Sequence, residues 1–187
     1  MPSLQEQAWI SADDYLEGEK RSPLKHEYVA GRVYAMAGSS VAHNRIAVNC
    51  AFLLLTKLRG GPCGVFVADL KVRIGPAEIF YYPDVVVSCH PEDLEPDAYS
   101  ISHPTLVIEV LSPSTERIDQ EEKLLNYRKL DSLHEYVLVS QDAMRVQIYR
   151  RAGGDWGMET IGRGERLRFD SVELDSSIEA LYENVRQ

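Results

Sequence analysis

The stretch TLVIEVLS (residues 105–112) is a nearly continuous apolar run interrupted by one acidic residue, Glu109. Runs without polar alternation are typical of a central strand that is covered on both faces of its sheet. An unpaired carboxylate inside such a strand costs several kcal/mol, so a metal ion or a cationic side chain is its natural partner. The run therefore predicts a layered α/β protein, and Glu109 predicts a functional site within it.

A second acidic residue, Asp84, stands between Pro83 and three valines in the strand-like run YPDVVVS (82–88). One interpretation is that Asp84 caps a turn at the strand entrance, where the ring of Pro83 restricts the backbone. The other is that this strand lies beside the strand of Glu109, so that both carboxylates reach one point. Hard ions such as Mg²⁺ prefer such oxygen ligands. These residues alone leave both interpretations open.

A helix from about Thr115 to Leu130 is predicted directly after the Glu109 strand. Asp119, Lys123 and Tyr127 are spaced at i, i+4 and i+8, so they lie on one face of it. On its own, this spacing is typical of an ordinary Asp–Lys pair on an exposed helix face. The position of the helix after the Glu109 strand makes Lys123 a candidate for the site.

The other patterns predict an α+β or α/β protein around one mixed sheet, with residues 1–187 in a single domain. They indicate a helix in DDYLEGEK (13–20) capped by Ser11, two strands in HEYVAGRVYAMA (26–37), a core helix from Ser39-Ser40 to Gly60, strands at 64–74, 135–140 and 144–150, a hairpin turn at GGDWG (153–157) and a closing helix at 176–185.

The net charge of −9 argues against a polyanionic partner only weakly, because the negative charge is concentrated. The segment EDLEPD (92–97) and the tail 170–187 together contribute −8 of it. The rest of the surface is therefore close to neutral and has room for local basic patches of the kind that bind nucleic acid.

Cysteine spacing and motifs exclude several classes of protein. Cys50, Cys63 and Cys89 are widely spaced and without a zinc-like pattern, so we expect reduced, packed thiols. The common signatures GxSxG, HExxH and GxxxxGK[ST] do not occur. The longest apolar run, CAFLLL (50–55), is far shorter than the roughly 20 residues that span a bilayer, and the first residues do not resemble a signal peptide. We therefore expect a cytoplasmic protein without a membrane partner.

Three segments together resemble a known family. YPDVVV, PTLVIEVLSPST and the spacing of Asp, Lys and Tyr in IDQEEKLLNY are similar to the Uma-type endonucleases of the PD-(D/E)XK nuclease superfamily. The similarity extends to EYVAGRVYAMAGSSVAHNRI and HEYVLVSQDAMRVQIYR, and so through most of the chain. The resemblance implies a restriction-endonuclease-like α/β/α core, with a mixed central sheet flanked by helices.

The resemblance also implies a role for individual residues. Asp84, Glu109 and the backbone carbonyl of Val110 would hold Mg²⁺ or Mn²⁺. The superfamily's usual lysine, two residues after the glutamate, is Leu111 here, so Lys123 on the next helix would take its place. Three further polar residues match the family pattern as auxiliary site residues: Glu27, His43 and Asp69.

The implied activity is metal-dependent hydrolysis of phosphodiester bonds in DNA. We also expect a homodimer, because twofold dimers are common and paired sites suit cleavage of both strands. The alternative is a catalytically weak or inactive nuclease-fold module that binds nucleic acid or a protein partner, a hypothesis that the displaced lysine favours. If Lys123 is not the catalytic lysine, Lys71 is the next candidate.

Overall fold

The computed structural model of the chain describes residues 9–75, 78–113 and 115–186. Its largest sheet has the strand order β11 (Asp155–Gly162), β10 (Arg145–Ala152), β9 (Glu135–Ser140), β8 (Pro104–Leu111), β6 (Val85–Ser88) and β3 (Gly64–Val67). The β8–β9 pair is parallel and the other pairs are antiparallel, so the sheet is mixed. The continuous apolar runs of β6, β8 and β9 occupy its centre, where both faces are covered.

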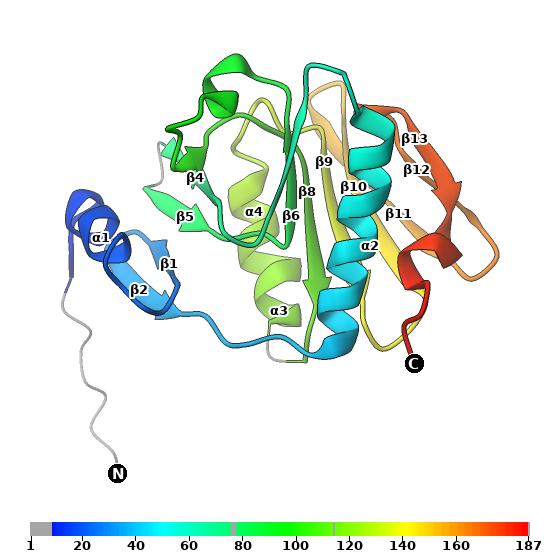
Figure 1. Ribbon diagram of the computed structural model, residues 1–187, viewed down its shortest axis with the longest axis horizontal. Helices are drawn as coiled ribbons and strands as arrows, with labels where there is room; N and C mark the ends of the chain where they lie inside the picture. Colours follow the sequence, from blue (N-terminus) through cyan, green and yellow to red (C-terminus); the bar gives the residue numbers. More distant parts are fainter. Residues whose placement is uncertain (1–8, 76–77, 114, 187) are drawn as a thin grey trace, which may run out of the picture.

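A second, five-stranded sheet lies beside the first (Figure 1). Its order is β2 (Arg32–Ala35), β1 (His26–Val29), β5 (Ile79–Tyr81), β4 (Lys71–Ile74) and β7 (Ser100–Ile101). The expectation of one sheet is therefore wrong, and so is the single strand predicted for 64–74. Ala68, between β3 and β4, has a φ of 44°, and this left-handed turn sends the two halves of the run into different sheets.

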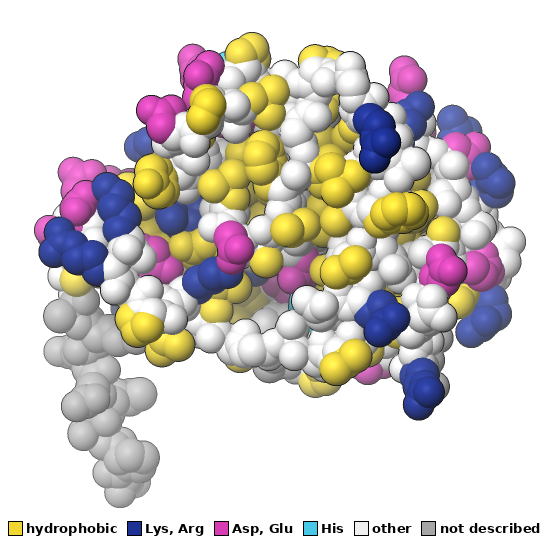
Figure 2. All heavy atoms as spheres, viewed as in Figure 1, with side chains coloured by type: hydrophobic (Ala, Val, Ile, Leu, Met, Phe, Trp, Pro, Cys, Tyr) yellow, Lys and Arg dark blue, Asp and Glu magenta, His cyan; other side chains and the backbone are white. Residues whose placement is uncertain are grey.

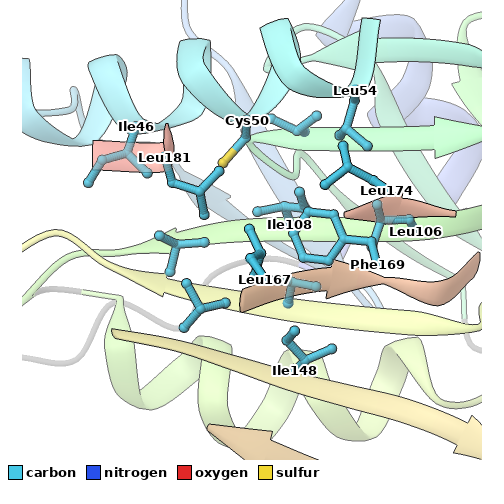
Figure 3. Close-up of a cluster of buried hydrophobic side chains, with 14 of the residues drawn as sticks. Ile46, Cys50, Leu54, Leu106, Ile108, Ile148, Leu167, Phe169, Leu174 and Leu181 are labelled. Carbon is cyan, nitrogen blue, oxygen red and sulfur yellow. The ribbon is translucent and has the colours of Figure 1, made fainter. Parts of the chain in front are cut away.

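Helices cover both faces of the six-stranded sheet, which confirms the predicted mixed α/β class. The long helix α2 (Val41–Leu58) packs on one face through Ile46, Cys50 and Leu54, which point toward Leu106 and Ile108 (Figure 3). The other face is covered by α3 (Glu116–Ile118), the π-helical segment η3 (Asp119–Lys123) and α4 (Leu124–Tyr127) (Figure 1). The sheet thus forms the middle of three layers.

The chain begins and ends with short elements. Ser11 and Ser40 accept hydrogen bonds from the backbone N–H groups of Asp14 and His43, both at 3.1 Å, and so cap α1 (Ala12–Glu19) and α2 as predicted. The closing helix predicted at 176–185 is shorter: β12 (Arg166–Phe169) and β13 (Leu174–Ser177) form a third sheet, followed by the 3₁₀ helix η5 (Ile178–Tyr182).

Among the described residues, no helix combines the length and apolar character needed to cross a membrane.

Cys63 and Cys89 form a disulfide bond, so the expectation of three reduced thiols is wrong for this pair. The antiparallel pairing of β3 with β6 sets Gly64 opposite Ser88 and places the two flanking cysteines 4.0 Å apart at Cα. Sequence spacing did not indicate this contact, because the two residues are 26 positions apart and meet only through strand pairing. Cys50 is a free, buried thiol, as expected.

Candidate active site

The register of β6 and β8 brings Asp84 and Glu109 together. Val85, the first residue of β6, pairs with Ile108, so Asp84 directly precedes the paired strand beside the part of β8 that carries Glu109. The two are close enough for the charge of Asp84 to act on Glu109. The backbone N–H of Val110 donates a hydrogen bond of 2.7 Å to Oδ2 of Asp84, which fixes that carboxylate against the neighbouring strand.

Lys123 reaches the same point from the helical layer. Its ammonium lies 3.1 Å from Oε1 of Glu109, 2.9 Å from Oε1 of Glu27 and 3.2 Å from Oδ1 of Asp119. Lys123 is 6% exposed and Asp119 is 2% exposed, so the expectation of an Asp–Lys pair on an exposed helix face is wrong. The polar face of this helix is buried because it packs against the carboxylates of the sheet.

The residues Asp119–Lys123 form a π-helical turn inside the otherwise α-helical segment. Such turns occur frequently at functional sites, because the extra residue changes which side chains face the partner. The hydroxyl of Tyr136 donates to the backbone carbonyl of Asp119 at 3.0 Å, and the hydroxyl of Tyr127 donates to Glu109 at 3.4 Å. Two tyrosines therefore hold the π turn and the glutamate in position.

Three residues that the sequence did not assign to the site belong to this cluster. Asp119 contributes a carboxylate, Tyr136 holds the π turn, and the ring of Tyr81 lies 5.3 Å from the Lys123 ammonium. The Tyr81 hydroxyl also donates to Glu122 at 2.9 Å and accepts from Asn126 at 2.7 Å. The i, i+4 spacing of Asp119 and Lys123 could have indicated from the sequence that Asp119 belongs to the site. The tyrosine contacts could not be predicted in this way, because they depend on tertiary packing.

The predicted auxiliary residues divide into two groups. Glu27 on β1 contacts Lys123, and Nε2 of His43 lies 2.8 Å from Oδ1 of Asp84. Asp69 is exposed and pairs with Lys25, and within the described ranges no hydrogen bond or ion pair joins Asp69 to the other site residues. Of the predicted residues, the structure brings together Asp84, Glu109, Lys123, Glu27 and His43, and it leaves Asp69 apart.

The cluster carries an excess of negative charge. In the part of the chain that the structure describes, Lys123 is the only lysine or arginine paired with Glu27, Glu109 or Asp119, and Asp84 pairs with His43. Burial raises the pKa of Glu109 well above its ordinary value; Lys123 opposes this rise, while the charges of Asp119, Asp84 and Glu27 add to it. Glu109 therefore binds a proton more readily than an exposed glutamate does.

The same surroundings shift the pKa of Lys123 in two opposite directions. Burial alone lowers its pKa, but the carboxylates of Glu109, Glu27 and Asp119 outweigh burial and hold the pKa well above its usual range. Lys123 is therefore an ammonium in this arrangement, suited to stabilising negative charge rather than to accepting a proton.

The donor set fits a hard divalent cation. It consists of carboxylate oxygens, the ligands that Mg²⁺ and Mn²⁺ prefer, and a divalent ion would offset the buried excess of negative charge. Asp84 lies just before β6 and Glu109 lies within the neighbouring strand β8, and the N–H of Val110, the residue after Glu109, donates to Asp84.

One protein family and two curated proteins resemble this chain over most of its length. The model of the family Uma2, described as "Putative restriction endonuclease", matches residues 12–179. In Synechocystis sp. (strain ATCC 27184 / PCC 6803 / Kazusa), "Uncharacterized protein slr1290" is 36% identical over 174 residues, which cover 92% of this chain and 91% of that protein. From the same organism, "Uncharacterized protein sll1609" is 30% identical over 168 residues, which cover 88% of this chain and 95% of that protein.

A solved structure shares the fold. A protein of Anabaena variabilis ATCC 29413, described as "a putative nuclease belonging to DUF820", superposes with a TM-score of 0.75. The superposition covers 93% of this chain and 98% of that one at 19% sequence identity.

Proposed function

Because the chain belongs to the Uma2 family, described as "Putative restriction endonuclease", we propose that it is a metal-dependent endonuclease that hydrolyses phosphodiester bonds of DNA. The observation that carries the proposal is the convergence of Asp84, Glu109 and Lys123 from two adjacent strands and the following helix. A buried group of acids with one ammonium is costly for folding, so its presence favours a chemical role.

In this proposal Asp84, Glu109 and the backbone carbonyl of Val110 hold one Mg²⁺ or Mn²⁺ ion. Such an ion supplies Lewis acidity toward the scissile phosphate and makes water more acidic. The hydrogen bond from the Val110 N–H and the contact with His43 orient the two oxygens of Asp84. His43 is therefore a positioning residue.

Lys123 would stabilise charge, in addition to the metal ion. Its raised pKa keeps it charged, so it stabilises negative charge that develops on the phosphoryl oxygens. Glu27 and Asp119 hold the ammonium in place from two sides. This assignment differs from a general base, which has to release its proton near neutral pH.

We also propose that two copies associate through α2. Hydrophobic side chains gather over this helix on the face shown in Figure 2. Val41, Val48, Phe52 and Leu55 are 78%, 57%, 66% and 54% exposed, and their spacing places them along one stripe of the helix. The spacing from Val48 to Phe52 to Leu55 is that of a helix–helix seam, which favours a second copy of the same helix as the partner.

A nuclease-fold module that binds nucleic acid or a protein without cleaving is the second candidate. The observation that favours it is Leu111, which replaces the usual lysine and is 5% exposed in the apolar core. Under this proposal the displaced Lys123 neutralises acids but does not support chemistry.

Supercoiled plasmid, incubated with the wild-type protein with and without Mg²⁺ or Mn²⁺, distinguishes the two. We expect nicked or linear DNA only with metal, and none with Asp84→Asn. Asp155→Asn changes an exposed acid at the β10–β11 turn and serves as the matched control, with wild-type cleavage expected. Intact plasmid at every metal concentration, together with a shift of the DNA in a native gel, would support the binding module instead.

A further inference from the structure

Two histidines meet at the end of the β6–β8 pair that lies away from Asp84. His90 follows β6 and His103 precedes β8, whereas Asp84 precedes β6. The length of strand between Asp84 and His90 is about 20 Å at roughly 3.3 Å per residue. The histidines therefore form a group separate from the candidate active site.

The two imidazole rings are stacked, with centroids 3.9 Å apart and ring planes at 22°. Glu92, on the 3₁₀ helix η2 (Pro91–Leu94), lies beside them, and one ligand atom from each of the three residues falls within 4.8 Å of the others. Considering the described residues only, Nδ1 of His90 is buried and has no hydrogen-bond partner, whereas the buried Nδ1 of His103 has the Asp93 carboxylate at 3.6 Å. A buried nitrogen without a partner is unfavourable, and a bound ion is one explanation for it.

Asp93 fixes the backbone around this group. It is 3% exposed, and it accepts hydrogen bonds of 2.8 Å from the backbone N–H groups of Ser102 and His103. The Ser88 hydroxyl donates to it at 2.7 Å, and one Asp93 oxygen lies 3.6 Å from Nδ1 of His103. Histidines that bind metal ions usually have a carboxylate near the other ring nitrogen, which holds the ring in orientation.

We propose that His90, Glu92 and His103 form a zinc-binding site with one open coordination position. Two imidazole nitrogens and one carboxylate are a ligand set with which proteins bind Zn²⁺, while Mg²⁺ prefers oxygen ligands alone. Binding requires one imidazole to rotate about its Cβ–Cγ bond, so that a nitrogen of each ring faces the same point. Glu92 is exposed and free to turn toward that point.

This site differs from the candidate active site in the type of its ligands and in the effect that a bound ion would have. A zinc ion here would tie the segment after β6 to the start of β8, the two strands whose pairing brings Asp84 near Glu109. The chain spacing of the three residues gives no zinc signature, because strand pairing brings the histidines together. The proposal does not depend on nuclease activity.

Isothermal titration calorimetry tests it, with Zn²⁺ added to protein that has been freed of metal with EDTA. We expect the wild-type protein to bind zinc at this site, and both His103→Ala and Glu92→Gln to bind it roughly tenfold more weakly or worse. Glu92→Gln changes an exposed side chain, so it tests the site even if His103→Ala fails to fold. Glu95→Gln, which changes an exposed acid of the same segment, is the control, with wild-type affinity expected.

A zinc affinity that is unchanged in Glu92→Gln and His103→Ala would overturn the proposal, as would a wild-type protein that binds no zinc. Loss of zinc binding in Asp84→Asn alone would place the ion in the acidic cluster instead. A zinc-dependent rise in melting temperature that Glu92→Gln removes would support the site by a second measurement.

Discussion

Glu109 and Glu135 are both glutamates within apolar strands, but their surroundings differ. Glu135 is 1% exposed, and it accepts hydrogen bonds from Arg150 at 2.8 Å and from the backbone N–H groups of Asp170 and Ser171 at 3.1 and 3.0 Å. These donors satisfy its charge and join the C-terminal segment to the sheet. Glu109 shares one ammonium with other acids. An excess of acids, rather than burial of an acid, therefore distinguishes the candidate site.

Substitution of Lys123 tests its role in both catalysis and folding. We expect Lys123→Ala to reduce cleavage by roughly 10² to 10³-fold, the usual cost of removing one group that stabilises charge in the transition state. The variant should also lose about 3–5 kcal/mol of stability, because buried carboxylates lose their cation. Lys123 is 6% exposed, so its substitution should affect folding as well as cleavage. Plasmid cleavage and urea denaturation measure the two effects.

Lys123→Arg separates the possible functions of the ammonium. Arginine keeps the positive charge but does not act as a base at neutral pH. Substantial activity in this variant would favour charge stabilisation over proton abstraction. Wild-type cleavage by Lys123→Ala, in a preparation where Asp84→Ala is inactive, would mean that another lysine acts. Lys71 would then be the next candidate, although it contacts Tyr82 at 3.2 Å rather than the acids.

The cysteines give a second prediction at this scale. Burial raises the pKa of the Cys50 thiol to about 12, and the thiolate is the reactive form. Ellman's reagent at pH 8 should therefore find no reactive thiol in the native protein and one after unfolding in guanidinium. Reduction before the assay should raise the number to all three cysteines of the chain. Three thiols in unfolded protein that was never reduced would contradict the Cys63–Cys89 bond.

Among the elements, those with strong local patterns could be predicted from sequence. The apolar runs of β8 and β9 and the capped, periodic helix α2 were predicted within a few residues of their ends. The three-residue strand β5 and the turn at Ala68 were missed, because short elements owe their form to their neighbours. The residue patterns and the family resemblance both made Asp84, Glu109 and Lys123 candidates, and their roles stay a prediction.

Other parts of the site could not be predicted, because they exist only in three dimensions. The hydroxyl contact of Tyr136 with the π turn joins residues that are 17 positions apart. The burial of Asp119 and Lys123 contradicts the rule that charged helix faces meet solvent, since that rule does not anticipate carboxylates on the facing sheet. In a sequence, a polar helix face that follows an apolar strand with one acidic residue indicates that the helix face is buried against that acid.

The exposed stripe of α2 leads to a prediction about assembly. We expect a dimer in light scattering at micromolar concentration and a monomer for Phe52→Glu, because a charge at the centre of the stripe is costly to bury. Leu125→Glu is the matched control: Leu125 is 63% exposed on α4, on the other face of the sheet, and this variant should remain a dimer. A monomeric wild-type protein would count against the twofold assembly.

For the whole molecule, the excess of buried negative charge predicts that a divalent ion stabilises the fold. At an Mg²⁺ concentration of 100 times the dissociation constant, linkage gives about 2.7 kcal/mol of added stability. The melting temperature should rise with Mg²⁺ and fall again with EDTA. The rise should disappear in Asp84→Asn and persist in Asp155→Asn. An unchanged melting temperature in the wild-type protein would show that the acids do not hold the ion.

The pairing of β6 with β8 also restricts how the length of this chain can vary during evolution. Deletion of one residue within either strand would move the side chains on one side of the gap to the opposite face, because strand side chains alternate. Asp84 and His90, at the two ends of β6, could not both keep their surroundings. The turn at Gly153–Gly154 has open space around it and can accept added residues. Insertions and deletions among descendants of this gene should therefore accumulate at that turn and be absent from β6 and β8.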